Sequence, residues 1–255
     1  MTRDSTDGAQ LLDALATEQI ELQTDLRALA PDDWFRPTPA RRWDVRDQIA
    51  HLADIDEIAI DTCLDGPRPL NDFAARFASP DDTTLWGVLR GRRMPGRDVL
   101  AWWEDTSARE RDVLASLDPA LRVPWGIGMR APSLITARLM ETWAHGLDVR
   151  EALGLPVVDT DRLRHVVWLG YRALPYAFSF AERERPPGEL RVEATSPSGD
   201  ETWEYGPTDA PNRITGPAGE LCRLFAQRIT REEARRLNAE GPGAVAALDV
   251  ARAFL

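Results

Sequence analysis

Residues 133–154, SLITARLMETWAHGLDVREALG, carry the strongest helical pattern in the chain. Ser133 is a favoured N-cap residue, and Gly154 is the residue type that most often follows the end of a helix. Apolar side chains return between them at helical intervals, at Leu139, Met140, Trp143 and Leu147. Within this helix Glu141 and His145 are four residues apart, so their Cβ atoms lie about 5–6 Å apart on one face. The pair can therefore share one metal ion.

A second helix is predicted from Asp44, a favoured N-cap with Asp47 at the third helical position, to about Leu64. His51 lies midway along it, on a stripe with Gln48, Ile55 and Ile58. The whole chain has only 3 histidines, so the position of each one is informative.

The two helices together predict a metal site, if they are neighbours. His51 would then meet Glu141 and His145 in the core, as imidazole and carboxylate ligands do in other metal-binding bundles. These ligand types suit zinc, and three protein ligands leave a position for water or substrate. Spacing alone also fits a surface hydrogen bond between Glu141 and His145.

The other helical patterns complete a bundle. They lie at 10–29, 97–117 and 161–180, and the first and second of these join the two helices above in a predicted four-helix bundle. Residues 65–96 are rich in Pro, Gly, Asp and Arg and predict a long connection with one short helix at 71–77. Loops of this length often cover functional sites.

The pattern changes after residues 185–188, Arg-Pro-Pro-Gly. Alternating side chains at 190–195 and 201–205, separated by turn residues, predict a hairpin, and a third strand is expected at 212–215. Helices are expected after Pro217 and at 245–254. We therefore predict a mainly α protein with an N-terminal four-helix bundle, residues 1–184, and a small α+β C-terminal domain, residues 185–255.

Composition excludes several functions. The formal net charge is -11, which opposes binding to nucleic acid. Every basic residue is arginine, so a lysine Schiff base and a phosphate-loop lysine are excluded. Two cysteines, Cys63 and Cys222, fit core positions in a reducing compartment. Without a leader or an apolar run long enough to span a bilayer, the chain is expected to be cytoplasmic, with no membrane partner, as a monomer or homodimer.

Two segments resemble a known family. RRWDVRDQIAHLADID (41–56) and VPWGIGMRAPSLITARLMETWAHGLDV (123–149) are similar to the signatures of the DinB-like, mycothiol-dependent maleylpyruvate isomerase superfamily. In that family a histidine of a Trp-x-x-x-Asp-x-x-x-His-Leu segment and the Glu and His of an E-x-W-x-H-G-x-D segment bind a divalent metal, usually zinc. The resemblance assigns these roles to His51, Glu141 and His145. Asp148 matches the acidic residue that ends the second motif, from which it can orient groups near the metal.

The resemblance continues into the C-terminal part. TSPSGDETWEYGP (195–207), ITGPAGELCRLFAQR (214–228) and GAVAALDVARAFL (243–255) are similar to the C-terminal domain of an actinobacterial subgroup. That domain is related to the wyosine-formation type and is loosely similar to sterol-carrier-like folds.

The family implies a mechanism. Its metal binds a low-molecular-weight thiol, mycothiol, as the thiolate, which attacks a small electrophilic substrate. Arg138 shares a helical stripe with Glu141, His145 and Asp148 and could position a carboxylate or the thiol. An exposed Arg138 paired with a nearby acid is the alternative. Arg223 and Arg228 are further candidates if the two domains enclose a cleft.

Three functions are open at this point: an isomerase or thiol transferase, a non-catalytic bundle that holds a structural metal or a ligand, and a metal hydrolase that uses bound water. Other prominent residues have simpler interpretations. His165 is expected at a boundary or the surface, and the acids Asp54, Asp56, Glu57 and Asp61 are expected on a solvated helix face. Packing is the default role of the tryptophans beside the motifs, Trp43, Trp125 and Trp143.

Overall fold

A computed structural model describes residues 8–67, 71–72, 75–76, 80–125 and 128–253 of the 255-residue chain. It divides into two compact units, Met1–Val157 and Val158–Leu255. Helices dominate the first unit, and the second combines helices with a sheet. The predicted fold class, mainly α with a small α+β C-terminal part, is confirmed.

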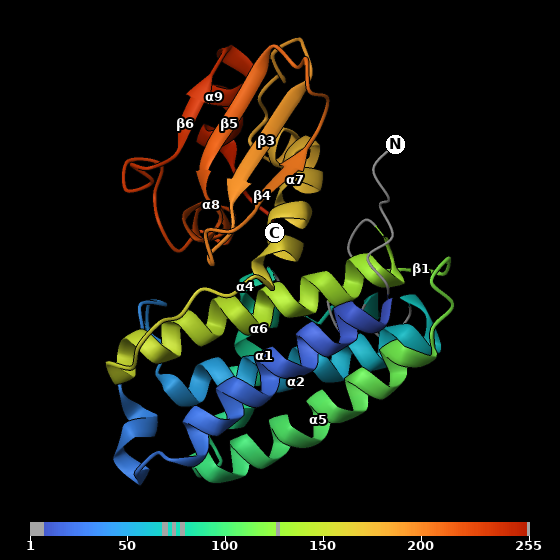
Figure 1. The fold of residues 1–255 in the computed structure, drawn as a ribbon. Coiled ribbons are helices and arrows are strands. Elements are labelled where there is room, and N and C mark those ends of the chain that lie inside the picture. The colour runs from blue at the N-terminus through green and yellow to red at the C-terminus, as the bar shows by residue number, and fades with distance from the viewer. Residues whose placement is uncertain (1–7, 68–70, 73–74, 77–79, 126–127, 254–255) are drawn as a thin grey trace. The chain divides into compact units, whose positions relative to one another are not determined.

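Four long helices form the first unit (Figure 1). They are α1 (Gly8–Arg27), α2 (Val45–Asp65), α5 (Gly96–Ser116) and α6 (Ala131–Leu153). α2 and α1 each pack against both α5 and α6. Their buried apolar side chains, including Leu22, Ile49, Leu52, Trp103 and Leu139, form the core between them. A short 3-10 helix, Pro31–Phe35, and a two-stranded ribbon of β1 (Arg122–Val123) and β2 (Met129–Arg130) lie in the connections.

The ends of the two motif helices follow from their sequences. Asp44 is the N-cap of α2: its side chain accepts from the Asp47 backbone N–H, and the Asp47 carboxylate accepts from the Asp44 N–H in return. α6 ends at Gly154, which adopts the left-handed conformation with φ 67°. It begins at Ala131, two residues before the predicted Ser133 cap, with Pro132 in its first turn.

The connection between α2 and α5 contains a helix that the sequence pattern does not predict, α4 (Pro80–Gly91). It packs closely against α2 at two of its glycines. A Cβ on Gly87 would lie 2.4 Å from Asp54 Cβ, and one on Gly91 would lie 2.3 Å from Ala50 Cβ. The short helix expected at 71–77 lies partly outside the described residues.

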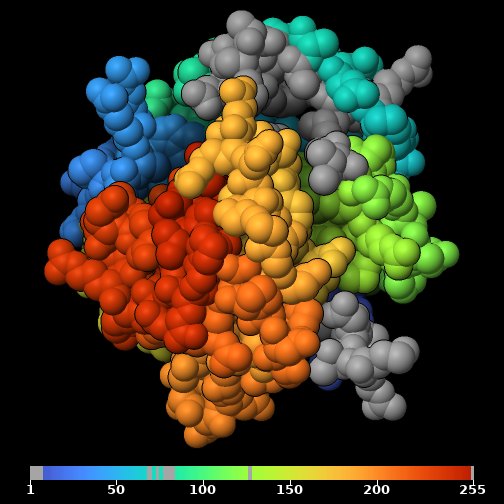
Figure 2. All heavy atoms as spheres, turned by 90° about the horizontal axis from the view of Figure 1, so that it is seen from above, coloured from blue at the N-terminus to red at the C-terminus, as the bar shows by residue number. Residues whose placement is uncertain are grey.

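The second unit contains a four-stranded sheet in the order β4-β3-β5-β6. Its elements are α7 (Leu163–Phe180), β3 (Leu190–Thr195), β4 (Thr202–Tyr205), β5 (Asn212–Pro217), α8 (Ala218–Phe225), β6 (Asn238–Glu240) and α9 (Pro242–Val250). The predicted hairpin is the antiparallel β3–β4 pair, while β5 runs parallel to β3 and β6 was not anticipated. In the space-filling view the atoms of this unit, coloured yellow-orange to red, lie packed against one another (Figure 2).

The boundary between the units lies between Val157 and Val158, earlier than the predicted 184/185. The reason is α7, which packs against α8, α9 and β4 of the second unit. Gly170 allows this packing, because a Cβ there would lie 2.1 Å from an atom of the Phe225 ring. The Pro- and Gly-rich stretch 185–188 is therefore a loop within the second unit.

His165 is buried in α7, 9% exposed, whereas a boundary or surface position was expected for it. Burial, with the nearby charge of Arg164, lowers its pKa from 6.5 to about 4. No helix in the described parts of the chain is both long and apolar enough to cross a membrane.

The low pKa of His165 predicts a pH dependence of stability. Between about pH 6.5 and pH 4 the unfolded chain binds a proton at this position that the folded chain does not. The free energy of unfolding therefore decreases as the pH is lowered through this range, by up to about 3 kcal/mol. Chemical denaturation of the wild type and of His165→Gln across this range measures the effect. The variant should lose less stability on acidification, and parallel pH profiles would contradict the prediction.

Candidate metal centre

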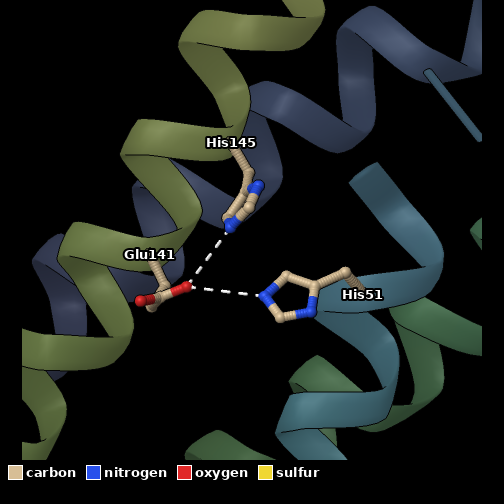
Figure 3. A group of neighbouring side chains, drawn as sticks. All are labelled: His51, Glu141 and His145. Carbon is tan, nitrogen blue, oxygen red and sulfur yellow. Dashed lines mark ion pairs between the residues drawn. The ribbon is translucent and has the colours of Figure 1, made fainter. Parts of the chain in front are cut away.

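The three predicted ligands converge between α2 and α6. Glu141 Oε2 lies 3.3 Å from His145 Nε2 and 3.7 Å from His51 Nε2. One ligand atom from each residue lies within 4.8 Å of the other two. Figure 3 shows His51 on α2 pointing across to Glu141 and His145 on α6. The assumption that these helices are neighbours is thus correct, and Glu141 and His145 are not an isolated pair on the surface of one helix, because His51 of α2 joins them.

The arrangement fits a divalent metal. Two ligand atoms that are each about 2.1 Å from a tetrahedral ion are about 3.4 Å apart, close to both separations from Glu141. Two imidazole nitrogens and a carboxylate oxygen are also the donors that zinc accepts in open sites. The side chains are 12% (His51), 24% (Glu141) and 11% (His145) exposed, so an outside ligand can reach them.

Glu141 is held as a carboxylate. Burial raises its pKa, but His145 and His51, when protonated, donate hydrogen bonds to the carboxylate and attract its charge, and together these effects outweigh burial and hold the pKa well below its ordinary value. An ionised Glu141 supplies the negative charge that a dication needs from its ligands.

Trp43 forms one wall of this centre. Its ring stacks on His145 with centroids 6.1 Å apart and an interplanar angle of 18°, and it lies 5.3 Å from the His51 ring. Trp43 therefore has the packing role expected for it, and the side chains it packs against are the candidate ligands His51 and His145. Gln48, from α2, lies on the opposite nitrogen of His145: its Oε1 is 2.5 Å from Nδ1.

Arg138 does not face this centre. It is 1% exposed, and its guanidinium donates to Asp56 Oδ1 at 2.5 Å and to Glu110 Oε1 at 2.8 Å. Asp56 and Asp54 are likewise buried, at 1% and 7%, so the expected solvated acidic face is wrong for these two residues. Burial and the neighbouring Glu110 raise the pKa of Asp56 well above its ordinary value, against the attraction of Arg138.

Other candidates have separate places in the fold. Asp148 is buried on α6 one turn after His145, 4% exposed, and its orienting role stays a prediction. Arg223 pairs with Asp159 inside the second unit, and Arg228 donates to the Ala226 carbonyl. Arg223 and Arg228 therefore have partners of their own.

Neither cysteine can act as a thiolate at neutral pH. Burial, with Glu110 nearby, raises the pKa of Cys63 to about 11. Burial also raises the pKa of Cys222 well above its ordinary value, and its thiol faces the Leu163 carbonyl. Cys222 is buried as predicted, whereas Cys63 is only partly buried against the core of the first unit. Any thiolate chemistry therefore needs a thiol from outside the chain.

Comparisons with known proteins identify similar chains. Residues 15–150 match the family described as the mycothiol maleylpyruvate isomerase N-terminal domain. Two uncharacterized proteins from two strains of Mycobacterium tuberculosis are each 36% identical over 241 residues, which cover 94% of this chain and 93% of theirs.

Solved structures share the fold. Crystal structures of the mycothiol-dependent maleylpyruvate isomerase and of a histidine-to-alanine mutant of it each superpose with a TM-score of 0.58 and 14% identity. The match covers 93% of this chain and 96% of each of those chains. At this identity the likeness establishes a common fold.

The environment of Arg138 predicts a large effect on stability. Arg138→Met would leave Asp56 and Glu110 buried without their cation, which should lower the free energy of unfolding by about 3–5 kcal/mol. Protonation removes the charge of the two buried carboxylates and so reduces the cost of burying them without a cation. The variant should therefore lose more free energy of unfolding at about pH 8 than at about pH 5. Urea denaturation at both pH values measures it.

Arg109→Met is the matched control. Its guanidinium is 57% exposed and pairs with Asp105 at 3.5 Å on the surface of α5. The control should lose no more than about 0.5 kcal/mol. If both variants lost the same free energy of unfolding, the buried ion pairs of Arg138 would stabilise the fold no more than an exposed pair does.

Proposed function

This chain belongs to the mycothiol maleylpyruvate isomerase family, as the resemblance of its two signatures indicated, and from that premise we propose that it is a metal-dependent enzyme that uses a low-molecular-weight thiol. The reaction is isomerisation of a small electrophile or transfer of the thiol to it. The observation that carries the proposal is the meeting of His51, Glu141 and His145 within 4.8 Å, with each side chain partly exposed.

The three residues have distinct roles in holding a divalent ion, zinc in this proposal. His51 and His145 supply neutral nitrogen donors, and Glu141 supplies charge from the same helix as His145. When bound, the ion lowers the pKa of a thiol or a water in its open position, so that the anion is available at neutral pH. Trp43 covers one side of the ligands and reduces the access of water to them.

The thiol comes from outside the chain because both cysteines keep their protons. Mycothiol is the thiol that the family description names. Its sulfur adds to an electrophilic carbon of a conjugated double bond, and the electron pair of that bond moves to the substrate's carbonyl oxygen. Rotation about the new single bond, followed by loss of the sulfur, gives the isomer and returns the thiol. Protonation in place of that loss gives the thioether product of transfer.

Metal content tests the centre directly. The purified wild type should hold about one divalent ion per chain, and His51→Ala and Glu141→Ala should lose most of it, since two protein ligands bind zinc far more weakly than three. Elemental analysis after exhaustive dialysis measures the content. Glu151→Ala, an exposed glutamate on the same helix, is the control and should retain the metal. Full retention by both ligand variants would remove the basis of the proposal.

Thiol binding separates an enzyme from a bundle with a structural metal. Titration calorimetry should detect mycothiol binding to the zinc-loaded wild type and little or none to Glu141→Ala. Turnover is then followed by absorbance with maleylpyruvate as the first substrate and mycothiol present or omitted. A zinc-loaded protein that binds no thiol, and that unfolds when the metal is chelated, would favour the structural role.

A further inference from the structure

A chain of hydrogen bonds connects His145 to the backbone of the loop before α2. The Thr38 hydroxyl lies 3.0 Å from the Trp43 carbonyl oxygen, and Gln48 Nε2 lies 2.8 Å from the Thr38 hydroxyl. At its other end, Gln48 Oε1 meets His145 Nδ1. Gln48 is fully buried, at 0% exposed, so bulk water does not compete for its amide.

The direction of every bond in this chain follows from its first member. The Trp43 carbonyl oxygen can only accept, and it lies 3.0 Å from the Thr38 hydroxyl oxygen, so the hydroxyl donates its single proton there, beside the Thr38 backbone N–H that donates to the same carbonyl. The Thr38 oxygen is then an acceptor for Gln48, which requires the amide nitrogen on that side. The amide oxygen must therefore face His145, and an oxygen of this kind can only accept a proton from Nδ1.

We propose that Gln48 is a positioning residue that holds neutral His145 in the tautomer with its proton on Nδ1 and the lone pair on Nε2 facing Glu141. The effect of Gln48 on zinc binding rests on the metal site proposed above. The tautomer of His145 can be tested without any metal. It assigns Gln48 a role that its place on the apolar stripe of α2 does not suggest.

The alternative tautomer would leave His145 without a free nitrogen for a metal ion at Nε2. With its proton on Nε2, His145 would donate to Glu141 Oε2, 3.3 Å away, and the pair would need no ion. With the proton on Nδ1, a nitrogen lone pair and a carboxylate oxygen face each other, an arrangement that a cation between them stabilises and that the hydrogen bond to Gln48 must hold by itself in the metal-free protein. Gln48 thus decides whether the same two side chains form a hydrogen bond or two ligands of one ion.

The tautomer can be observed in the metal-free protein. Long-range proton–nitrogen correlation spectra distinguish the two neutral forms of imidazole, and a chain with 3 histidines gives few signals. At a pH where the imidazoles are neutral, His145 of the wild type should carry its proton on Nδ1, and His145 of Gln48→Leu should carry it on Nε2. The same tautomer in both proteins, or a proton on Nε2 in the wild type, would overturn the proposal.

Zinc affinity measures the consequence. Competition with a chelator should show about 10–100-fold weaker binding for Gln48→Leu, the range found for partners that orient a metal-binding histidine. Gln48→Glu keeps an acceptor for Nδ1 and should restore most of the affinity. Gln23→Leu is the control: it removes another buried amide of the bundle, one that donates to Ser107, and should bind zinc as the wild type does.

The possible failures are distinct. If the wild type binds no zinc, the proposed function fails, and the spectra still decide the tautomer. If the wild type and Gln48→Leu bind zinc equally well while both stay folded by circular dichroism, the metal site stands and the role of Gln48 is refuted.

Discussion

A buried cluster of charges holds the four long helices together. Arg138 on α6 donates to Asp56 on α2 and to Glu110 on α5, and Gln19 on α1 donates to the remaining oxygen of Glu110. Trp103 on α5 donates to the second oxygen of Asp56. Taking these charges out of water is costly, and only this geometry satisfies them, so a shift of one helix along another would leave a charge unpaired. The cluster therefore sets the register in which His51 of α2 meets the ligands of α6.

The candidate metal centre lies on two of the helices that carry this cluster, α2 and α6, but has the opposite relation to solvent. Arg138, Asp56 and Glu110 are each 1% exposed, whereas the side chains of the candidate ligands are 11–24% exposed. Water cannot reach this cluster, so its charged groups can form hydrogen bonds only with one another. The cluster therefore favours the one helix packing that brings these groups together. Ligands with partial access can take an ion and an outside molecule. One helix pair thus combines a closed polar site, which orders the bundle, with an open one about a turn away, which is available for chemistry.

The sequence predicted what depends on local spacing and missed what depends on partners from elsewhere in the chain. Glu141 and His145 are brought together by one turn of helix, and the Asp44 cap and Gly154 end are equally local. The helical spacing correctly puts Arg138 on the same helix as the ligands. It could not reveal the two acids that pair with Arg138 from α2 and α5. Helix α4 was missed because two of its closest approaches to α2 are at Gly87 and Gly91, and glycines add nothing to an apolar period. The domain boundary was placed too late because a Pro- and Gly-rich loop resembles a linker whichever unit α7 packs against.

Trp43 links two properties of the centre, its shape and the direction of its hydrogen bonds. Its ring packs against both histidines and so shapes the space beside the ligands, while its backbone carbonyl is the fixed acceptor from which the hydrogen bonds to His145 take their direction. Thr38 and Trp43 also form a backbone hydrogen bond, and Asp44 follows at once as the cap of α2, so the loop is tied to the helix that carries His51. A movement of this loop would change the wall and the orientation of His145 together. The centre is therefore a unit of two helices and one loop, in which the protonation of one imidazole nitrogen depends on the backbone carbonyl of Trp43 in that loop.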